Sequence, residues 1–597
     1  MRSKFRFLAF LACGTVAVAT TVATASAADM GKTLHVAFPV AENGFDPQVV
    51  YDTYSFDVCR AIFEPLYTFD YFARPVRLVP NTAESLPVMT DGGRTYTIKV
   101  KRGIFFAADP AFKGKPRELT AEDYVFSIKR MIDPKVRSYW LYLLEKNLVG
   151  LDPVLARARE SGTLDYDTPI EGLKAIDRYT LQIRFNRPDY AFQTWLATGQ
   201  FGAVAREVVE MYKDSSNRVM ENPVGTGPYV LKQWTRGQKI VLEANPAFRE
   251  MRYPAPGPGS EPGDGATASG LVGKRLPLVG NIDIRVIEEP QPRLLSFNSG
   301  ALDYFNVPPT LAENILTGAA LKPEFAKRNM VLHRQVSPSI SFFYFNLEDP
   351  LVGGYTQDRL ALRRAISMGY DRKGRIVQVL NGQAIPATQP VPPALYGHDP
   401  KYAARYGYDP AAARALLDRF GYKDRDGDGY RELPDGKPLT LIIASTPDAA
   451  SRVSDELWKR SMDAIGIRVE FLKNKWPELN KMSEAGQLML WGFGWISSIP
   501  DGRDYYSYFY SRNIGMSNDA RMRLPLMDAL FEEALALPDG PKRTALFDRM
   551  NDLVYDYAPW ILTDYPYTNV VAQPWLRGYK QNPFIPQQWW YYDVAAH

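Results

Sequence analysis

Hydrophobic and polar residues alternate with a period of two in several short segments of the first half of the chain. Such alternation is typical of strands with one buried face. The segments with this pattern are 33–38, 96–100, 180–185, 229–233, 239–243 and 282–287. Residues 254–280 interrupt them with twelve Gly or Pro residues. This content is too high for a regular element, so we expect an exposed surface loop between two strands.

Helical periodicity becomes frequent later in the chain. An early helix is expected from Thr120, where Asp123 completes a capping pattern, and Pro134 ends it. After residue 300 the segments with a helical period are 358–370, 410–420, 449–465 and 524–537. Strand patterns at 439–444 and 468–472 alternate with these helices, which indicates an α/β region with its own sheet. The two halves of the pattern predict at least two lobes.

The first 27 residues are typical of an export signal. Arg2, Lys4 and Arg6 precede an apolar run, and small residues lead up to Ala27. We expect a signal peptide at 1–27 and a periplasmic protein, soluble or loosely associated with a membrane transporter. A second interpretation remains open, in which Cys13 lies in a lipoprotein cleavage box and becomes a lipid anchor. Cleavage after Ala27 leaves Cys59 as the sole thiol, so no internal disulfide is expected.

Composition narrows the function classes. The 597 residues are 46% hydrophobic and 23% charged, enough apolar surface for more than one core. The formal net charge is +4, and three of the positive charges lie in the signal segment. The rest of the chain is therefore close to neutral, which argues against nucleic acid as a partner.

Catalytic motifs are missing from the sequence. The four His residues are far apart and none has a metal-binding spacing, and no phosphate-binding or dinucleotide-binding loop is complete. We therefore expect no catalytic residues, no cofactor and no metal. One alternative stays open: the residues from Asp424 to Asp435 nearly match a calcium loop, but Asp435 stands where the bidentate Glu belongs, and a strand follows. A structural turn is the other interpretation.

Aromatic residues are dense between 491 and 510, where eight occur in twenty positions. Trp491 and Trp495 are four residues apart with Gly492 and Gly494 interleaved, so a strand would place both indoles on one face. That face could stack on a ligand. Ordinary core packing is the alternative for each of these aromatic residues.

Several segments together resemble family 5 of the solute-binding proteins of ABC transporters, the peptide-binding family (cluster C). The resemblance rests on the order and spacing of short segments across nearly the whole chain. They include Phe45-Asp-Pro-Gln, Phe63-Glu-Pro-Leu-Tyr, Leu119-Thr-Ala-Glu-Asp-Tyr-Val-Phe-Ser, Pro223-Val-Gly-Thr-Gly-Pro-Tyr, Arg363-Arg-Ala-Ile-Ser-Met-Gly-Tyr-Asp and Gly494-Trp495 with Pro500-Asp501.

The resemblance implies an α/β, two-lobed periplasmic-binding-protein fold of type II, with an additional small α/β domain on the first lobe. Lobe 1 would comprise 28–62, 170–303 and 566–597, and 63–169 would be its appended domain. Lobe 2 would comprise 304–565. Hinges are expected near 303–306 and 563–565, and ligand would bind between the lobes.

The resemblance also implies ligand-binding residues. Trp495 matches a cleft-lining Trp of the peptide binders, but Ser498 stands where those proteins have an Asp that pairs with the peptide's α-amino group. A hydroxyl supplies no countercharge, so capture of a free amino terminus by Ser498 is not expected. Asp501 or Asp504 could substitute. Further candidate ligand-binding residues are Trp491, Tyr51 and Tyr54.

The resulting hypothesis is a periplasmic receptor that delivers a peptide or peptide-like ligand to an ABC permease by hinge closure, without catalysis and as a monomer. The ligand could also be a modified peptide or another amphipathic molecule. Two rivals remain: a secreted hydrolase acting on peptides or glycans, and a non-transporting receptor or chaperone of the same fold.

Overall fold

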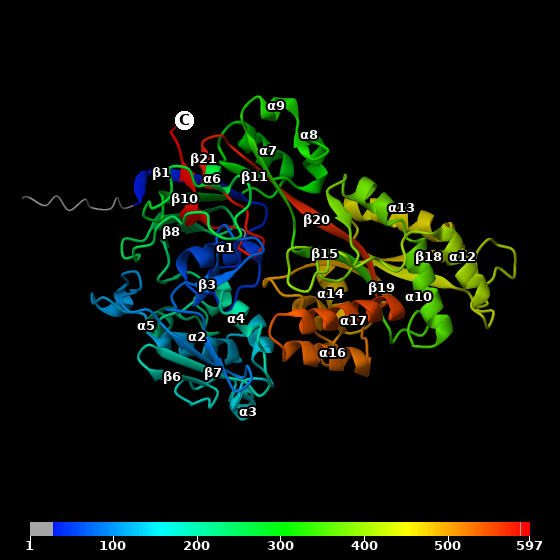
Figure 1. The fold of residues 1–597 in the computed structure, drawn as a ribbon, viewed down its shortest axis with the longest axis horizontal. Helices are drawn as coiled ribbons and strands as arrows, with labels where there is room; N and C mark the ends of the chain where they lie inside the picture. Colours follow the sequence, from blue (N-terminus) through cyan, green and yellow to red (C-terminus); the bar gives the residue numbers. More distant parts are fainter. Residues whose placement is uncertain (1–27, 586, 597) are drawn as a thin grey trace, which may run out of the picture.

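The computed structural model describes residues 28–585 and 587–596, and it has two lobes (Figure 1). The beginning of the chain and its last segment lie in the same lobe, lobe 1, while lobe 2 is formed by the second half of the sequence. The predicted signal segment 1–27, including Cys13, lies outside the described residues. Within them, no helix is both long and apolar enough to cross a membrane.

The central sheet of lobe 1 has the strand order β1-β10-β9-β8, with β1 parallel to β10 and the other pairs antiparallel. These strands are β1 (Asp29–Phe38), β8 (Tyr229–Thr235), β9 (Lys239–Ala244) and β10 (Val279–Val286). Leu34, Val36 and Phe38 are buried at alternate positions of β1, as the sequence pattern predicts. The helix α1 (Thr53–Ile62) follows β1 and contains the buried, unpaired Cys59.

A second sheet forms the appended domain, with the order β4-β5-β7-β6. Its strands are β4 (Val88–Thr90), β5 (Thr95–Lys99), β6 (Leu173–Asp177) and β7 (Thr180–Arg184). Helix α2 (Ala121–Ile132) has the predicted capping box between Thr120 and Asp123. The expected domain boundary at residue 169 falls too early, because β6 and β7 pair with β5 and not with the central sheet of lobe 1.

Lobe 2 is the predicted α/β region. Its sheet runs β15-β19-β17-β18, from β15 (Ser339–Phe345), β17 (Thr440–Ser445), β18 (Arg468–Lys473) and β19 (Leu490–Ile496). The longer helices of this lobe are α10 (Gln357–Gly369), α12 (Pro410–Arg419), α13 (Ala449–Asp463), α14 (Trp476–Glu484), α16 (Pro525–Leu535) and α17 (Pro541–Tyr557). The helices and strands that the sequence predicts here are all present, which confirms the alternation.

The 13-residue strand β20 (Trp560–Ala572) joins the two lobes. Its first part pairs with β15 and with β16 (Ala384–Pro386), whereas residues 567–572 pair with β14 (Val331–Val336). The short β11 (Tyr304–Asn306) also pairs with this last part. Segment 304–336 therefore lies on the lobe 1 side of β20 (Figure 1).

The pairing of β11 and β14 with β20 moves the hinge that the sequence places at 303–306. Asp303 forms two hydrogen bonds with His35 of lobe 1: its backbone N–H donates to the His35 carbonyl, and its side-chain carboxylate accepts from the His35 N–H. Residues 303–306 are thus fixed within lobe 1. The first crossing between the lobes lies after β14, near Ser337, whose N–H donates to the Pro566 carbonyl.

Residues 254–280 form the irregular and largely exposed loop that the sequence predicts. They contain the short helix α6 (Asp264–Thr267), and Leu271 and Leu276 are buried. Lys580, close to the end of the chain, donates to the Asp264 carboxylate at 2.6 Å. The loop is irregular, but the buried side chains of Leu271 and Leu276 and the ion pair to Lys580 attach part of it to lobe 1.

The two glycines of β19 provide a stability test. A Cβ at Gly492 would overlap the ring of Phe343, whereas at Gly494 the nearest atom would be 3.6 Å away. We expect Gly492→Ala to lower the free energy of unfolding by about 1–3 kcal/mol through overpacking. Gly494→Ala, on the same face of the same strand, is the control and should change it little. Chemical denaturation measures both, and equal losses would contradict this packing.

Candidate functional site

The strand β19 presents three aromatic side chains on one face. It pairs antiparallel with β15 so that Trp491, Phe493 and Trp495 stand opposite Tyr344, Phe342 and Ile340. Successive side chains of a strand alternate between faces, so the glycines lie on the other face. There Phe343 packs at 4.9 Å against Trp458, in the core of lobe 2. Gly492 therefore makes room for the core ring of Phe343 rather than for a ligand, whereas Gly494 contacts no ring.

Exposure along this face differs from one end of the strand to the other. Trp491 is only 3% exposed, with Phe493 at 5.1 Å and Trp476 at 6.2 Å between ring centroids. Trp495 is half-buried, and its ring centroid lies 5.2 Å from that of Tyr508. The indole N–H of Trp495 donates to Oδ2 of Asp504 at 3.0 Å. Of the two tryptophans, Trp495 is thus the one that retains surface for a ligand.

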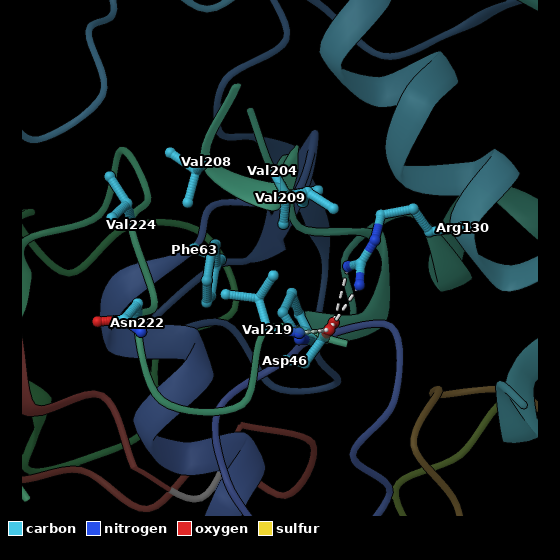
Figure 2. A pocket seen from close by; sticks show the side chains of 10 residues that line it. Asp46, Phe63, Arg130, Val204, Val208, Val209, Val219, Asn222 and Val224 are labelled. Atoms are coloured by element: carbon cyan, nitrogen blue, oxygen red, sulfur yellow. Dashed lines mark hydrogen bonds and ion pairs between the residues drawn. The ribbon is translucent and has the colours of Figure 1, made fainter. Parts of the chain in front are cut away.

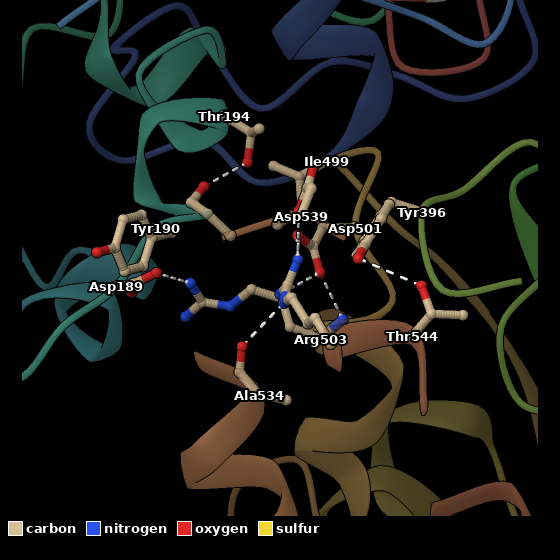
Figure 3. A network of polar contacts seen from close by, with 12 residues as sticks. Asp189, Tyr190, Thr194, Tyr396, Ile499, Asp501, Arg503, Ala534, Asp539 and Thr544 are labelled. Carbon is tan, nitrogen blue, oxygen red and sulfur yellow. Dashed lines mark hydrogen bonds and ion pairs between the residues drawn. The ribbon is translucent and has the colours of Figure 1, made fainter. Parts of the chain in front are cut away.

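Asp501 has a buried partner. Its two carboxylate oxygens accept from Nη1 and Nη2 of Arg543 at 2.7 and 2.9 Å, and Asp501 is 3% exposed (Figure 3). Such bidentate pairs are strong and directional. Because both oxygens are engaged, we leave Asp501 out of the site proposed below.

Arg503 connects the two lobes. It is the first residue of the short helix α15 (Arg503–Tyr506) in lobe 2, and its guanidinium forms an ion pair with Asp189, which follows β7 of the appended domain (Figure 3). Asp189 is buried, and the Arg503 side chain is 17% exposed. A second, exposed pair joins Arg187 to Glu532 at 3.2 Å. The two lobes therefore meet along this edge.

Lobe 1 contributes its own aromatic residues near this interface. They lie at Tyr51 and on the 3₁₀ helix η2 (Tyr139–Leu143), where Ser138 caps the helix and Trp140 donates to the Val50 carbonyl at 3.0 Å. The ring centroids of Tyr51 and Tyr139 are 5.5 Å apart. Tyr51, Tyr139 and Tyr142 are 67%, 51% and 44% exposed, high values for large rings. They form an open aromatic surface.

A buried ion pair holds the loop that leads to Tyr51 in this aromatic surface. Arg130 of α2 binds Asp46 with two hydrogen bonds of 2.8 and 2.6 Å, and neither side chain is exposed (Figure 2). Arg130 also donates to Oε1 of Gln48 at 2.6 Å. The cavity beside this pair has a volume of about 10 Å³, and a single water needs roughly 10–15 Å³. The ion pair supports the loop before Tyr51, and the cavity is too small for a ligand.

The aromatic surface of lobe 1 lies close to Asp504 of lobe 2. Burial raises the pKa of Tyr139 and of Tyr142, and in each case the charge of Asp504 is the first electrostatic contribution to that rise. Tyr508 of lobe 2 shows the same two causes, burial and then Asp504. The charge of Asp504 therefore acts on tyrosines of both lobes. We refer to Tyr139, Tyr142, Trp495, Asp504 and Tyr508 as the interlobe cluster.

The other predicted residues lie around this cluster or apart from it. Ser498 is half-buried, and its hydroxyl has no hydrogen bond within the part of the chain that the structure describes. Tyr54 is half-buried in α1 against Phe38 at 5.0 Å, and burial raises the pKa of Tyr54 to about 12. Sequence reasoning missed Tyr139 and Tyr142. The aromatic run from 139 to 142 was the available signal.

The acidic turn forms the compact loop expected from sequence. The Asp424 carboxylate accepts from the backbone N–H of Gly427 and of Gly429 at 2.7 and 3.0 Å. Ligand oxygens of Asp424, Asp426, Asp428 and Glu432 lie within 4.8 Å of one another. Asp428 also forms an ion pair with Arg468. The backbone bonds account for the turn, and the calcium alternative stays untested.

Comparison with known proteins identifies relatives over nearly the whole chain. The family model "Bacterial extracellular solute-binding proteins, family 5 Middle" matches residues 77–517. Heme-binding protein A of Haemophilus influenzae is 24% identical over 91% of this chain and 88% of its own length. Di/tripeptide-binding protein 2 of Pseudomonas aeruginosa is 25% identical over 92% and 93%.

Solved structures with a similar fold are also periplasmic binding proteins. The periplasmic binding protein DppA of Helicobacter pylori, solved in complex with the peptide STSA, matches with a TM-score of 0.71 at 19% identity and covers 94% of this chain and 98% of its own. The predicted fold class, a two-lobed α/β binding protein of type II, is confirmed.

The ion pair between Arg503 and Asp189 allows a test of how the two lobes are held together. Replacing Arg503 by Ala removes the buried contact between the lobes and leaves Asp189 without its partner, so the closed arrangement becomes less favourable. We expect a larger radius of gyration for the ligand-free variant in small-angle scattering. Arg523→Ala is the control, because Arg523 pairs with Glu348 inside lobe 2 at 3.0 Å. An unchanged radius for Arg503→Ala would show that the bridge does not hold the lobes together.

Proposed function

The chain belongs to the bacterial extracellular solute-binding proteins of family 5, and from this premise we propose that it is the periplasmic receptor of an ABC importer. In this role it binds a solute between its lobes and presents the closed form to the membrane permease. The solute-binding role follows from the family. The importer, the periplasmic location and the identity of the solute belong to the proposal.

The observation that carries this proposal is the interlobe cluster. The charge of Asp504 raises the pKa of tyrosines in both lobes, and the ion pair between Arg503 and Asp189 joins the lobes next to it. A ligand that touches both surfaces favours the closed arrangement, since it gains contacts only there. Binding therefore drives closure without any chemical step.

A peptide or peptide-like ligand fits this surface best. Aromatic rings stack on apolar and amide groups, while Ser498, three residues after Trp495, is half-buried and could donate a hydrogen bond. Two of the relatives described above are a di/tripeptide-binding protein and a binding protein solved with a peptide. We include Trp495, Ser498, Tyr51, Tyr139 and Tyr142 among the contact residues.

The proposed partners are the transmembrane subunits of the permease, and the receptor acts as a monomer with no cofactor. None of the three relatives is named as an enzyme, so the alternative of a hydrolase is not favoured. A non-transporting receptor or chaperone would share the fold and differ only in its partner.

Native mass spectrometry of the protein purified from its own periplasm tests the ligand directly. We expect a co-purified peptide or peptide-like molecule, and adding that molecule to the emptied protein should reduce the radius of gyration. If a saturating ligand left the scattering profile unchanged, binding between closing lobes would be excluded. A protein that turned over the molecule instead of retaining it would support the hydrolase.

Replacing Trp495 by Ala should weaken binding more than it destabilises the fold. The variant loses a stacking surface worth about 1–3 kcal/mol of binding free energy. Trp458→Ala is the matched control, because Trp458 is 1% exposed in the core of lobe 2. That change should cost about 3–5 kcal/mol of stability. Calorimetry and thermal melting separate the two effects, and a stability loss with unchanged affinity for Trp495→Ala would place its ring in the core.

A further inference from the structure

Residues 381–383 of lobe 2 lie where the partners of β20 change, and they contact lobe 1 through side chains. They directly precede β16, which pairs with β20 up to Pro566. The side-chain amide of Asn381 donates to the carbonyl of Pro309, in the segment between β11 and β14, at 3.0 Å. A short piece of lobe 2 therefore reaches across the hinge, in addition to the two crossings of the chain itself.

Arg334 of β14 makes a second contact to this piece of lobe 2. Its Nη1 donates to Oε1 of Gln383 at 2.6 Å and to Oδ1 of Asn569 on β20 at 2.5 Å. Nδ2 of Asn569 donates to the same Gln383 oxygen at 2.9 Å. The guanidinium carbon lies 3.6 Å from the ring centroid of Tyr567. The cation of Arg334 is thus held by two buried neutral amides and one aromatic face.

The backbone of residues 381–383 has an unusual conformation. It follows the π-helical turn η5 (Arg375–Val379), and Asn381 has a positive φ of 49°, beside Gly382 at 73°. Residues other than glycine adopt this region uncommonly, and such a conformation persists where the surrounding contacts determine it. The hydrogen bonds from Arg334 and to Pro309 are contacts of this kind, and both come from the lobe 1 side.

We propose that Arg334 is a positioning residue for closure, and that its bond to Gln383 is a hinge clamp that favours the arrangement in which the lobes are in contact. The inference rests on the proposed function, because it assigns what controls the movement that binding uses. Arg334 belongs to the ladder on the lobe 1 side of Pro566, and Gln383 precedes the strand on the lobe 2 side. Rotation at Pro566 therefore changes the length and angle of the hydrogen bond between them, and a hydrogen bond tolerates little of either change. The hinge clamp thus opposes opening.

The hinge clamp predicts opposite effects of two substitutions on the ligand-free protein. Arg334→Ala removes the clamp, so the radius of gyration in small-angle scattering should increase. Gln383→Glu replaces the neutral acceptor by a carboxylate, and a charge-assisted hydrogen bond is about twice as strong, so the radius should decrease. An unchanged radius for Arg334→Ala would overturn the inference, and so would a shift in the same direction for both variants.

A purely structural role of Arg334 is separated by its melting temperature and by two further variants. Arg236→Ala is the matched control, because Arg236 lies 4.9 Å from the ring centroid of Trp234 within lobe 1, and this variant should keep the wild-type radius. Arg334→Lys restores a charged donor, so its radius should lie between those of the wild type and Arg334→Ala. A lower melting temperature of Arg334→Ala at an unchanged radius would show that this residue only stabilises the fold, and would overturn the inference.

Ligand release provides the second readout, with the tripeptide Phe-Ala-Ala as the probe and stopped-flow fluorescence as the measurement. Loss of a hydrogen bond that opposes opening should raise the dissociation rate constant of Arg334→Ala at least about twofold, and Gln383→Glu should lower it. Equal dissociation rates for the wild type and Arg334→Ala would overturn the inference while leaving the receptor function intact. If the tripeptide does not bind the wild type, the peptide ligand of the proposed function is wrong, and the scattering of the ligand-free variants still decides on the hinge clamp.

Discussion

The shared strand β20 constrains every motion that the two lobes can make. One part of its hydrogen-bonded ladder belongs to the sheet of lobe 2, and residues 567–572 pair with β14 on the lobe 1 side. A paired strand resists bending within a ladder, so rotation must be concentrated where the partners change, at Pro566 and at the facing Ser337. Such a connection allows the lobes to move as rigid bodies and directs their motion toward the interlobe cluster.

In each lobe a buried Arg–Asp pair holds a loop next to the interlobe cluster. Arg130 and Asp46 fix the loop that leads to Tyr51, and Arg543 and Asp501 fix the loop that carries Asp504. Breaking a buried pair leaves an uncompensated charge and costs about 3–5 kcal/mol. These pairs therefore contribute geometry more than ligand contacts: they hold irregular segments rigid, without the backbone ladder that supports a strand.

Sequence patterns within single helices and strands predicted much of the fold. They could not predict which strands distant in the sequence pair with one another. The helix at Thr120 is specified by its own capping residues, and the strand at 33–38 by its own alternation. The boundary at residue 169 and the hinge at 303–306 were misplaced because they depend on which distant strand a segment joins. In the site, Trp495 was found by its spacing on a strand. Asp501 and Asp504 could not be distinguished, because Arg543 is 42 residues from Asp501.

Contact between the two lobes depends on the guanidinium of Arg503. Arg503 is adjacent to Asp504 in the chain and would be the nearest cation available to it. In the closed arrangement that guanidinium is committed to Asp189 of the opposite lobe. Contact between the lobes thus neutralises Asp189, while Asp504 is stabilised by hydrogen bonds from Trp495 and Ser497. A ligand that touches both lobes gains its second set of contacts only when the lobes are together, so its binding favours the arrangement that this ion pair also stabilises.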